Sequence, residues 1–336
     1  MIAAHCTAHD YNDPGKPAIS WDDAAAREAL VDALVGDAHR LLGYLPEQEL
    51  GVRAAEAVAL LALIAGQDVE PVEGSDGTDG QWRIAQRVAP DRVISTVDPE
   101  ARHAHKTVHR RQDGFKAHVA VEPDTGIVTD CVLTKASGPG THDAAVAADL
   151  LNGESRPVTV LADSAYGSGE FRSHLAQAGH QDRVKSAPLR PAVEAGFTVD
   201  DFLVDHTART ATCPAGVTRT LSRTGVATFK AACRRCSLRA QCTTSVLGKS
   251  LKVGPHDALQ LTARQQSRNA HWLNDYRQHR PMVERSIAWL TRGNRRVRYR
   301  GVTKNDHWLH HRAAALNLRR LVAMGLTHTG TTWAIA

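Results

Sequence analysis

Two carboxylates stand where they could serve phosphate chemistry. Asp163 follows the apolar run TVLA (159–162) and precedes a turn, and Glu284 is the single acid in a run that contains eight arginines, YRQHRPMVERSIAWLTRGNRRVRYRG (276–301). Ligands bind beyond the carboxyl ends of strands in open α/β sheets, so Asp163 is well placed for a site. Carboxylate oxygens suit Mg²⁺ or Mn²⁺, which can activate a water or a 3′-hydroxyl for phosphoryl transfer. Arginines would then hold the phosphates.

Each carboxylate also has a purely structural interpretation. Asp is common before Ser-Ala and Gly turns, so Asp163 could cap the following turn. Tyr276, Arg280 and Glu284 are spaced i, i+4, i+8 and share one helical face. Arg280 and Glu284 could therefore be a plain i,i+4 ion pair, worth about 0.3–0.5 kcal/mol on an exposed helix. The combination of a strand-end Asp, a helical Glu and dense arginines favours the metal-ligand interpretation of both acids.

Four cysteines form a second candidate site. Cys213, Cys233, Cys236 and Cys242 have the spacing C-x19-C-x2-C-x5-C. Four thiols with one CxxC pair predict a tetrahedral, structural Zn²⁺ site. The alternative is a set of unrelated reduced thiols, because a cytosolic setting disfavours structural disulfides.

Charge is distributed unevenly along the 336 residues. Residues 1–100 carry 7 Lys+Arg against 18 Asp+Glu, whereas the remaining residues carry 34 against 18. So basic a second part predicts a polyanionic partner, usually nucleic acid, over a merely solvated surface. The longest apolar run, AVALLALIAG (57–66), is too short to span a bilayer, and MIAAHCTAHDYND does not resemble a signal peptide. We therefore expect a cytoplasmic protein without a membrane partner.

Periodicity and turn residues predict a mixed α/β chain. Strands interspersed with helices indicate an α/β sheet with a hairpin at one side. Ser20 is the expected N-cap of the first helix. The expected elements are helices at 20–42 and 51–65, a strand at 92–98, a hairpin at 115–134, a helix at 141–151, a strand, turn and helix at 159–179, and helices from about 261 to 325.

These blocks resemble a known family. TVLADSAYGS and YRQHRPMVERSIAWL look like the second Asp and the Glu of bacterial insertion-sequence transposases of the DDE class. ISTVDPEARHAHK, DGFKAHVAVEPDTGIVTDCVLT, TCPAG with CRRCSLRAQC, RVRYRG and AAALNLRRLV extend the resemblance over roughly residues 85–325. The resemblance implies an RNase H-like mixed sheet flanked by helices, with Asp163 and Glu284 catalytic. Tyr276 and Arg280 would support Glu284, although the spacing of Tyr276 to Arg280 is one residue longer than in similar transposases, and position 291 is Thr with Arg292 beside it.

The first Asp of the catalytic set has no clear counterpart. In similar transposases it lies in an Asp-Ser-Thr or Asp-Gly-Thr strand upstream of the DPEAR block, preceded by a DNA-binding helical region, and neither is found here. Two interpretations remain open. Either the chain is a truncated transposase, which we prefer, or Asp98 at the end of RVISTVD takes that role. Asp98 could equally be a turn residue before Pro99.

The expected organisation has four parts: an acidic helical region and loop (1–84), RNase H-like core strands and helices (85–196), a Cys-rich insertion (197–260), and a C-terminal helical part that carries the Glu (261–336). The expected function is metal-dependent DNA strand cleavage and strand transfer by a homo-oligomer on the element ends and target DNA. The alternatives are a non-catalytic DNA-binding remnant and a nuclease of the same fold. The expected DNA-binding residues are Arg280, Arg292, Arg295, Arg296, Arg298 and Arg300.

Overall fold

The computed structural model describes residues 5–45, 50–77, 80–86, 89, 91–104, 112–292 and 295–335. The chain divides into two compact units, each assembled from segments that are separate in the sequence. Unit 1 contains Met1–Lys116, Lys135–Pro139 and Tyr299–Lys304, and unit 2 contains Ala117–Thr134, Gly140–Arg298 and Asn305–Ala336. No helix among the described residues is long and apolar enough to cross a membrane.

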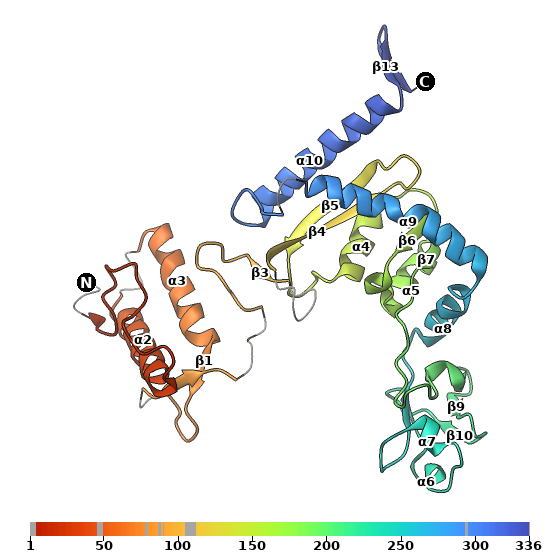
Figure 1. The fold of residues 1–336 in the computed structure, drawn as a ribbon, viewed down its shortest axis with the longest axis horizontal. Coiled ribbons are helices and arrows are strands. Elements are labelled where there is room, and N and C mark those ends of the chain that lie inside the picture. Colours follow the sequence, from red (N-terminus) through yellow and green to blue (C-terminus); the bar gives the residue numbers. More distant parts are fainter. Residues whose placement is uncertain are drawn as a thin grey trace. The chain divides into compact units, whose positions relative to one another are not determined.

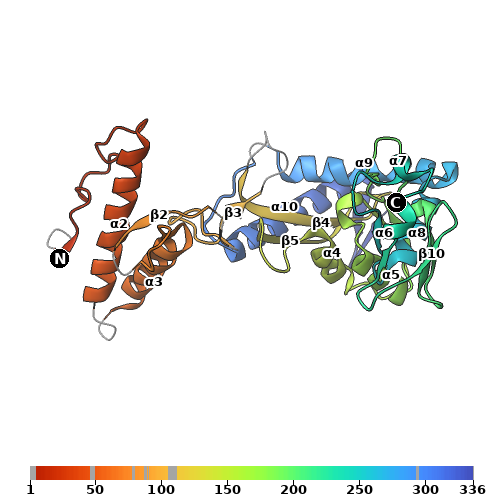
Figure 2. The same cartoon turned by 90° about the horizontal axis from the view of Figure 1, so that it is seen from below.

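Unit 1 begins with two helices that pack against each other and against a small antiparallel ribbon (Figure 2). The N-cap of the first helix is Asp23, whose side chain accepts a hydrogen bond from Ala25 N at 3.0 Å, so the prediction of Ser20 was wrong. Asp precedes the helix as readily as Ser, and here it stands directly before the first helical turn. The elements are α2 (Ala24–Tyr44), α3 (Val52–Gln67), β1 (Val69–Pro71) and β2 (Trp82–Ile84).

The expected strand at 92–98 does not form. Val93 is buried, but its backbone pairs with a side chain: Gln67 Nε2 donates to Val93 O at 2.6 Å, and Val93 N donates to Gln67 Oε1 at 3.0 Å. The Gln67 amide thus bonds the backbone groups of Val93 that a neighbouring strand would otherwise pair with. A single side chain cannot continue this pairing along the segment, so no strand forms. The next strand along the chain is β3 (Arg102–His103), which pairs antiparallel with the start of β4 (Asp113–Val121).

The predicted hairpin is present and is fastened to a helix of unit 2. β4 and β5 (Val128–Lys135) lie in the three-stranded sheet β3-β4-β5. Helix α10 (Val302–Ala323) runs beside β5 (Figure 1), where Asn317 exchanges two 2.8 Å hydrogen bonds with the backbone of Val128. Asp306 accepts a hydrogen bond from Leu133 N at 2.7 Å. The polar side chains of the helix therefore satisfy backbone groups that no further strand meets.

A strand–helix–strand unit follows, as the turn pattern predicted. β6 and β7 pair in parallel from Thr159 opposite Gln181 to Ala162 opposite Val184. The connecting helix buries Phe171 and Leu175 against Ala162 and Val184, and this apolar core holds the strand ends rigid. The elements are α4 (Asp143–Leu151), β6 (Thr159–Ala162), η1 (Ser164–Tyr166), α5 (Gly169–Gln177) and β7 (Gln181–Val184).

The Cys-rich region forms a small lobe with its own core, in which Ala211, Ala227 and Phe229 are almost fully buried. Its elements are η2 (Val199–Asp201), β8 (Leu203–Asp205), β9 (Thr210–Thr212), β10 (Thr218–Thr220), β11 (Val226–Thr228), α6 (Lys230–Cys233), α7 (Arg239–Cys242) and β12 (Ser250–Lys252).

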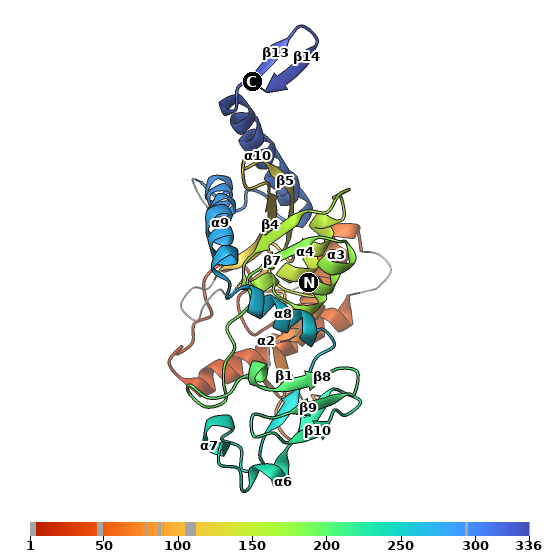
Figure 3. The same cartoon turned by 90° about the vertical axis from the view of Figure 1, so that its right-hand side faces the viewer.

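Helices complete unit 2, as predicted for the last part of the chain. They are α8 (Asp257–Gln266), α9 (Ala270–Leu290) and α10, and a terminal hairpin β13 (Leu326–Thr329) and β14 (Thr332–Ile335) extends beyond the end of α10 (Figure 3). The α/β class is therefore confirmed. Within the described residues, however, β3-β4-β5 and β6-β7 are separate sheets, so an RNase H-like sheet stays a prediction.

Candidate active site

Asp163 lies directly beyond the carboxyl end of β6. Its carboxylate caps η1, where Oδ1 accepts a hydrogen bond from Ala165 N at 2.9 Å. The side chain is 46% exposed, so the carboxylate is fixed in direction but remains open to solvent. The capping role that the sequence allowed is therefore present, and so is the open position at a strand end on which the metal-ligand interpretation depends.

Arg280 brings Asp163 and Glu284 together. Helix α9 packs against β6, and its N-cap is Asn269, whose side chain accepts hydrogen bonds from His271 N and Trp272 N. Arg280 Nη2 donates to Asp163 Oδ2 at 3.2 Å, and Arg280 Nε lies 3.9 Å from Glu284 Oε1. One guanidinium therefore faces two carboxylates, of which Glu284 is the more exposed at 68%.

Two tyrosines border this group of charges. Burial raises the pKa of Tyr166 to about 12, and the negative charges of Asp143 and Asp163 add to the rise while Arg280 opposes it. Burial also raises the pKa of Tyr276, which the Arg280 guanidinium counteracts. Tyr276 stacks on Trp272, with ring centroids 5.3 Å apart. Both phenols consequently stay protonated and can act as neutral hydrogen-bond donors beside the carboxylates.

Asp143 is a neighbour that the sequence interpretation missed. It opens α4, which packs against η1, and its Oδ1 lies 3.6 Å from Nδ1 of the buried His118. His118 Nε2 lies 3.2 Å from Thr134 Oγ1 on β5. The sequence predicts only a helix at 141–151, with Asp143 near its start. Tyr166, three residues after Asp163 in ADSAY, was the available sequence signal for a neighbour of the site.

Asp98 lies in unit 1, whereas Asp163 and Glu284 lie in unit 2. Its Oδ2 accepts a hydrogen bond from Gly301 N at 3.2 Å, and its Oδ1 accepts one from Glu100 N at 3.3 Å. Ala101 N donates to Asp98 O at 3.0 Å, which closes a turn. Asp98 is therefore a turn residue before Pro99, one of the two structures that the sequence allowed, and its catalytic role stays a prediction.

The comparison with protein families bears directly on this geometry. Residues 212–322 of the chain match the family described as Transposase DDE domain. The resemblance to DDE-class transposases is thereby confirmed. The matched segment contains Arg280, Glu284 and the four clustered cysteines, and Asp163 precedes it. No curated protein and no solved structure matches the chain.

The segment that matches the family, residues 212–322, exposes most of its arginines. Helix α9 ends at Leu290, and the guanidinium of Arg292 lies over the Trp289 ring at 4.9 Å. Arg319 approaches the same ring at 4.7 Å, and Arg312 donates to the carbonyls of Trp289 and Arg292. The remaining predicted DNA-binding residues are exposed and lie in the segment between α9 and α10: Arg295, Arg296, Arg298 and Arg300.

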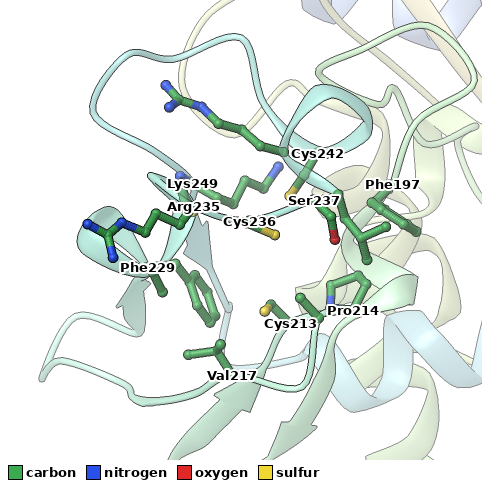
Figure 4. Close-up of a pocket in the computed structure, with 15 residues that line it drawn as sticks. Phe197, Cys213, Pro214, Val217, Phe229, Arg235, Cys236, Ser237, Cys242 and Lys249 are labelled. Carbon is green, nitrogen blue, oxygen red and sulfur yellow. Dashed lines mark hydrogen bonds between the residues drawn. The ribbon is translucent and has the colours of Figure 1, made fainter.

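The four clustered cysteines of the matched segment are free thiols that line one cavity of about 280 Å³. In Figure 4 the side chains of Cys213, Cys236 and Cys242 point into the same space. Burial raises the pKa of Cys242, and Lys249 opposes that rise. Cys233 Sγ accepts a hydrogen bond from Lys249 N at 3.4 Å.

The arrangement of these thiols does not by itself form a metal site. Among the described residues, no group of three or more His, Cys, Asp or Glu side chains is arranged to hold a metal ion. The donor types fit Zn²⁺, whereas their positions in this structure do not form a ligand set. A structural zinc stays a prediction.

Proposed function

We propose that the chain is a DDE-type transposase that cleaves DNA at the ends of an insertion sequence and joins them to target DNA, with Mg²⁺ or Mn²⁺. The observation that carries the proposal is the approach of Arg280 to both Asp163 and Glu284, which come from distant parts of the sequence. The match of residues 212–322 to the transposase domain supports the reaction class, and it implies DNA as the partner.

The two carboxylates fit a divalent cation by donor type and accessibility. Mg²⁺ is commonly bound through one or two carboxylates plus substrate phosphates, with waters in the remaining positions. Asp163 and Glu284 would hold the ion, which when bound activates the attacking oxygen and stabilises the leaving oxygen. The first Asp of the catalytic set is not assigned by this geometry, and Asp98 remains the alternative to a truncated chain that lacks it.

The protein's own groups would prepare the reaction. The Ala165 N–H fixes the direction of the Asp163 carboxylate. Arg280 would keep the two carboxylates close to each other, and it can also donate a hydrogen bond to a phosphate oxygen of the bound strand. Tyr166 and Tyr276 remain protonated and can donate a hydrogen bond without adding charge. The arginines after α9 would hold the DNA backbone and set its register. The further parts of the proposal are an RNase H-like core, a Zn²⁺-stabilised Cys-rich insertion and a homo-oligomer on DNA.

Metal-dependent cleavage of labelled DNA that carries the element ends tests this proposal. We expect Asp163→Asn and Glu284→Gln each to lower the cleavage rate by at least 10²-fold, on the order of the loss of one essential charged group in an active site. Glu154→Gln is the matched control, because Glu154 is an exposed acid of the same unit outside the site. Cleavage at the parental rate in both site variants would contradict the assignment.

The same assay separates the remaining alternatives. Loss of cleavage in Asp98→Asn would give Asp98 the first carboxylate's role. Cleavage without joining to target DNA would indicate a nuclease, and salt-sensitive binding without cleavage would indicate a non-catalytic DNA-binding protein.

A further inference from the structure

One segment of unit 2 contains no acidic residue. Between Asp205 and Asp257, residues 206–256 include neither Asp nor Glu, although the whole chain has 36 of them in 336 residues. We call residues 206–256 the basic lobe. Its nine Lys and Arg residues are Arg209, Arg219, Arg223, Lys230, Arg234, Arg235, Arg239, Lys249 and Lys252.

Most of these cations face solvent. Arg239 and Lys249 are half-buried and the other seven are exposed. No ion pair joins any of the nine to a carboxylate among the described residues, and the lobe itself is described throughout. In Figure 4 the guanidinium of Arg235 extends away from the thiol-lined cavity. The positive charge is therefore not neutralised within the lobe.

Three of the arginines lie in or beside the paired strands β9 and β10: Arg209 directly precedes β9, Arg219 is in β10, and Arg223 follows β10. Arg219 lies opposite Ala211 in the β9–β10 pair, and Leu221 N donates to Arg209 O at 2.7 Å. The Arg209 guanidinium in turn donates to Ser222 O at 2.6 Å. Arg209 is thus held across from the stretch that runs from Arg219 to Arg223. We call these three residues the arginine edge.

The arginine edge rests on a rigid base. Ala211 and Ala227 are fully buried and Phe229 is 2% exposed, so the strands that carry the arginines are fixed by a packed core. Strand β10 is exposed along its length, and the exposed residues Thr218, Thr220, Ser222 and Thr224 flank Arg219 and Arg223 in the sequence. Arginine guanidinium groups combined with Thr and Ser hydroxyls are the donors that proteins present to DNA phosphates.

Self-repulsion among uncompensated cations destabilises a compact lobe, and a polyanion relieves it. We infer that the basic lobe is a second DNA-binding surface, which contacts the phosphate backbone of duplex DNA through the arginine edge. This inference rests on the proposed function for its choice of DNA as the polyanion. It adds a surface separate in sequence from the arginines at 280–300.

The contribution of this surface to DNA binding can be measured through counterion release, from the salt dependence of the binding constant. Each phosphate contact contributes about 0.9 to the slope of log Kobs against log salt concentration for duplex DNA. We expect the full chain with Arg219→Gln and Arg223→Gln to lose about 1.8 from that slope. Arg209 is left unchanged because its guanidinium also bonds the Ser222 carbonyl. The measurement uses duplex DNA without added divalent cation, with thermal unfolding to confirm that the variant is folded.

The matched control removes the same charge elsewhere in unit 2. Arg156 and Arg190 are exposed and lie outside the basic lobe, so Arg156→Gln with Arg190→Gln should leave the slope unchanged. An unchanged slope in the Arg219/Arg223 variant, or an equal loss in the control, overturns the inference. Binding to anionic phospholipid vesicles that depends on Arg219 and Arg223, with an unchanged DNA slope, also overturns it.

The salt dependence of binding and the cleavage assay test the two proposals separately. A slope that falls as expected while no variant or parent cleaves DNA would support the basic lobe and contradict the proposed catalysis. Cleavage that depends on Asp163 and Glu284, together with an unchanged slope, would do the reverse.

Discussion

Arg280 donates a hydrogen bond to Asp163, which lies 117 residues earlier in the chain. The contact joins the end of strand β6 to the face of helix α9 that also carries Glu284, four residues beyond Arg280. Asp163 is 46% exposed and Arg280 is 20% exposed, so solvent screens their attraction. An exposed ion pair of this kind contributes little to folding. Its effect is to hold the Asp163 carboxylate near that of Glu284.

Replacing Arg280 should therefore change stability only slightly. We expect Arg280→Gln to lower the free energy of unfolding by less than about 1 kcal/mol, the usual range for solvent-exposed pairs. Urea denaturation measures the change. A loss above about 2 kcal/mol would show that Arg280 supports the fold, contrary to our interpretation of it as a site residue.

Arg172 provides the contrasting case. Its side chain is 1% exposed, pairs with Asp182, and also donates to Gln260 Oε1, Val184 O and Ser186 Oγ. Arg172→Met would leave Asp182 without its ion-pair partner, with only the hydrogen bond from Val184 N among the described residues, and the buried Val184 carbonyl without this donor. Breaking a buried pair from one side costs about 3–5 kcal/mol, so urea denaturation should show a loss of that size. Arg183→Met is the control, because Arg183 is 27% exposed and its pair with Asp275 is 3.4 Å long.

Asn317 tests how the hairpin is held by α10. Its side chain both accepts from Val128 N and donates to Val128 O, and Val128 is buried. Asn317→Ala leaves two backbone groups without partners, at about 1–3 kcal/mol for each unsatisfied group. Chemical denaturation should show that loss. Gln177→Ala is the matched control, because the Gln177 amide, on an exposed surface, bonds Ser173 and no other described residue. Equal losses in the two variants would contradict the role of Asn317.

The sequence predicted what local patterns determine. Apolar periodicity and turn residues gave the hairpin, the β6–α5–β7 unit and the last helices, because those signals lie within each segment. It failed at 92–98, where a β-branched run satisfies its backbone through Gln67 of an earlier helix rather than through a strand. No local pattern reports that long-range pairing.

The candidate site shows the same limit. Asp163, Arg280 and Glu284 could be selected from their types and settings, and the i,i+4 spacing predicted that Arg280 faces Glu284. The contact from Arg280 to Asp163 and the nearness of Asp143 to Tyr166 depend on how α9 and α4 pack, which spacing does not encode.

Tyr166 should make folding sensitive to alkaline pH. Burial and the charges of Asp143 and Asp163 raise its pKa to about 12 in the folded chain, against about 10 in an unfolded chain. The folded state therefore holds this proton more tightly. The corresponding stability is fully present below pH ~10 and is lost as the pH rises toward about 12.

The measurement is the free energy of unfolding across that pH range for the parent chain and Tyr166→Phe. We expect the variant to lose about 2–3 kcal/mol less than the parent, since one pKa unit corresponds to about 1.36 kcal/mol. Tyr44→Phe, at an exposed position of unit 1, should follow the parent. Parallel curves for the parent and Tyr166→Phe would contradict the raised pKa.

Zinc content tests the thiol-lined cavity. Cys213, Cys233, Cys236 and Cys242 line one space and provide the four soft donors that a structural Zn²⁺ site uses. The thiols are not arranged as a ligand set in this structure, so a Zn²⁺ ion bound by all four would have to draw them together and would contribute directly to folding. The zinc hypothesis therefore predicts one zinc per chain by elemental analysis and a lower melting temperature after chelation. Cys213→Ser and Cys236→Ser, both at half-buried positions, should each abolish zinc binding. Cys131→Ala, in strand β5 outside the cavity, should retain it. Absence of zinc from the parent chain, with all six thiols titrating as free, would show instead that the cavity is lined by ordinary reduced cysteines.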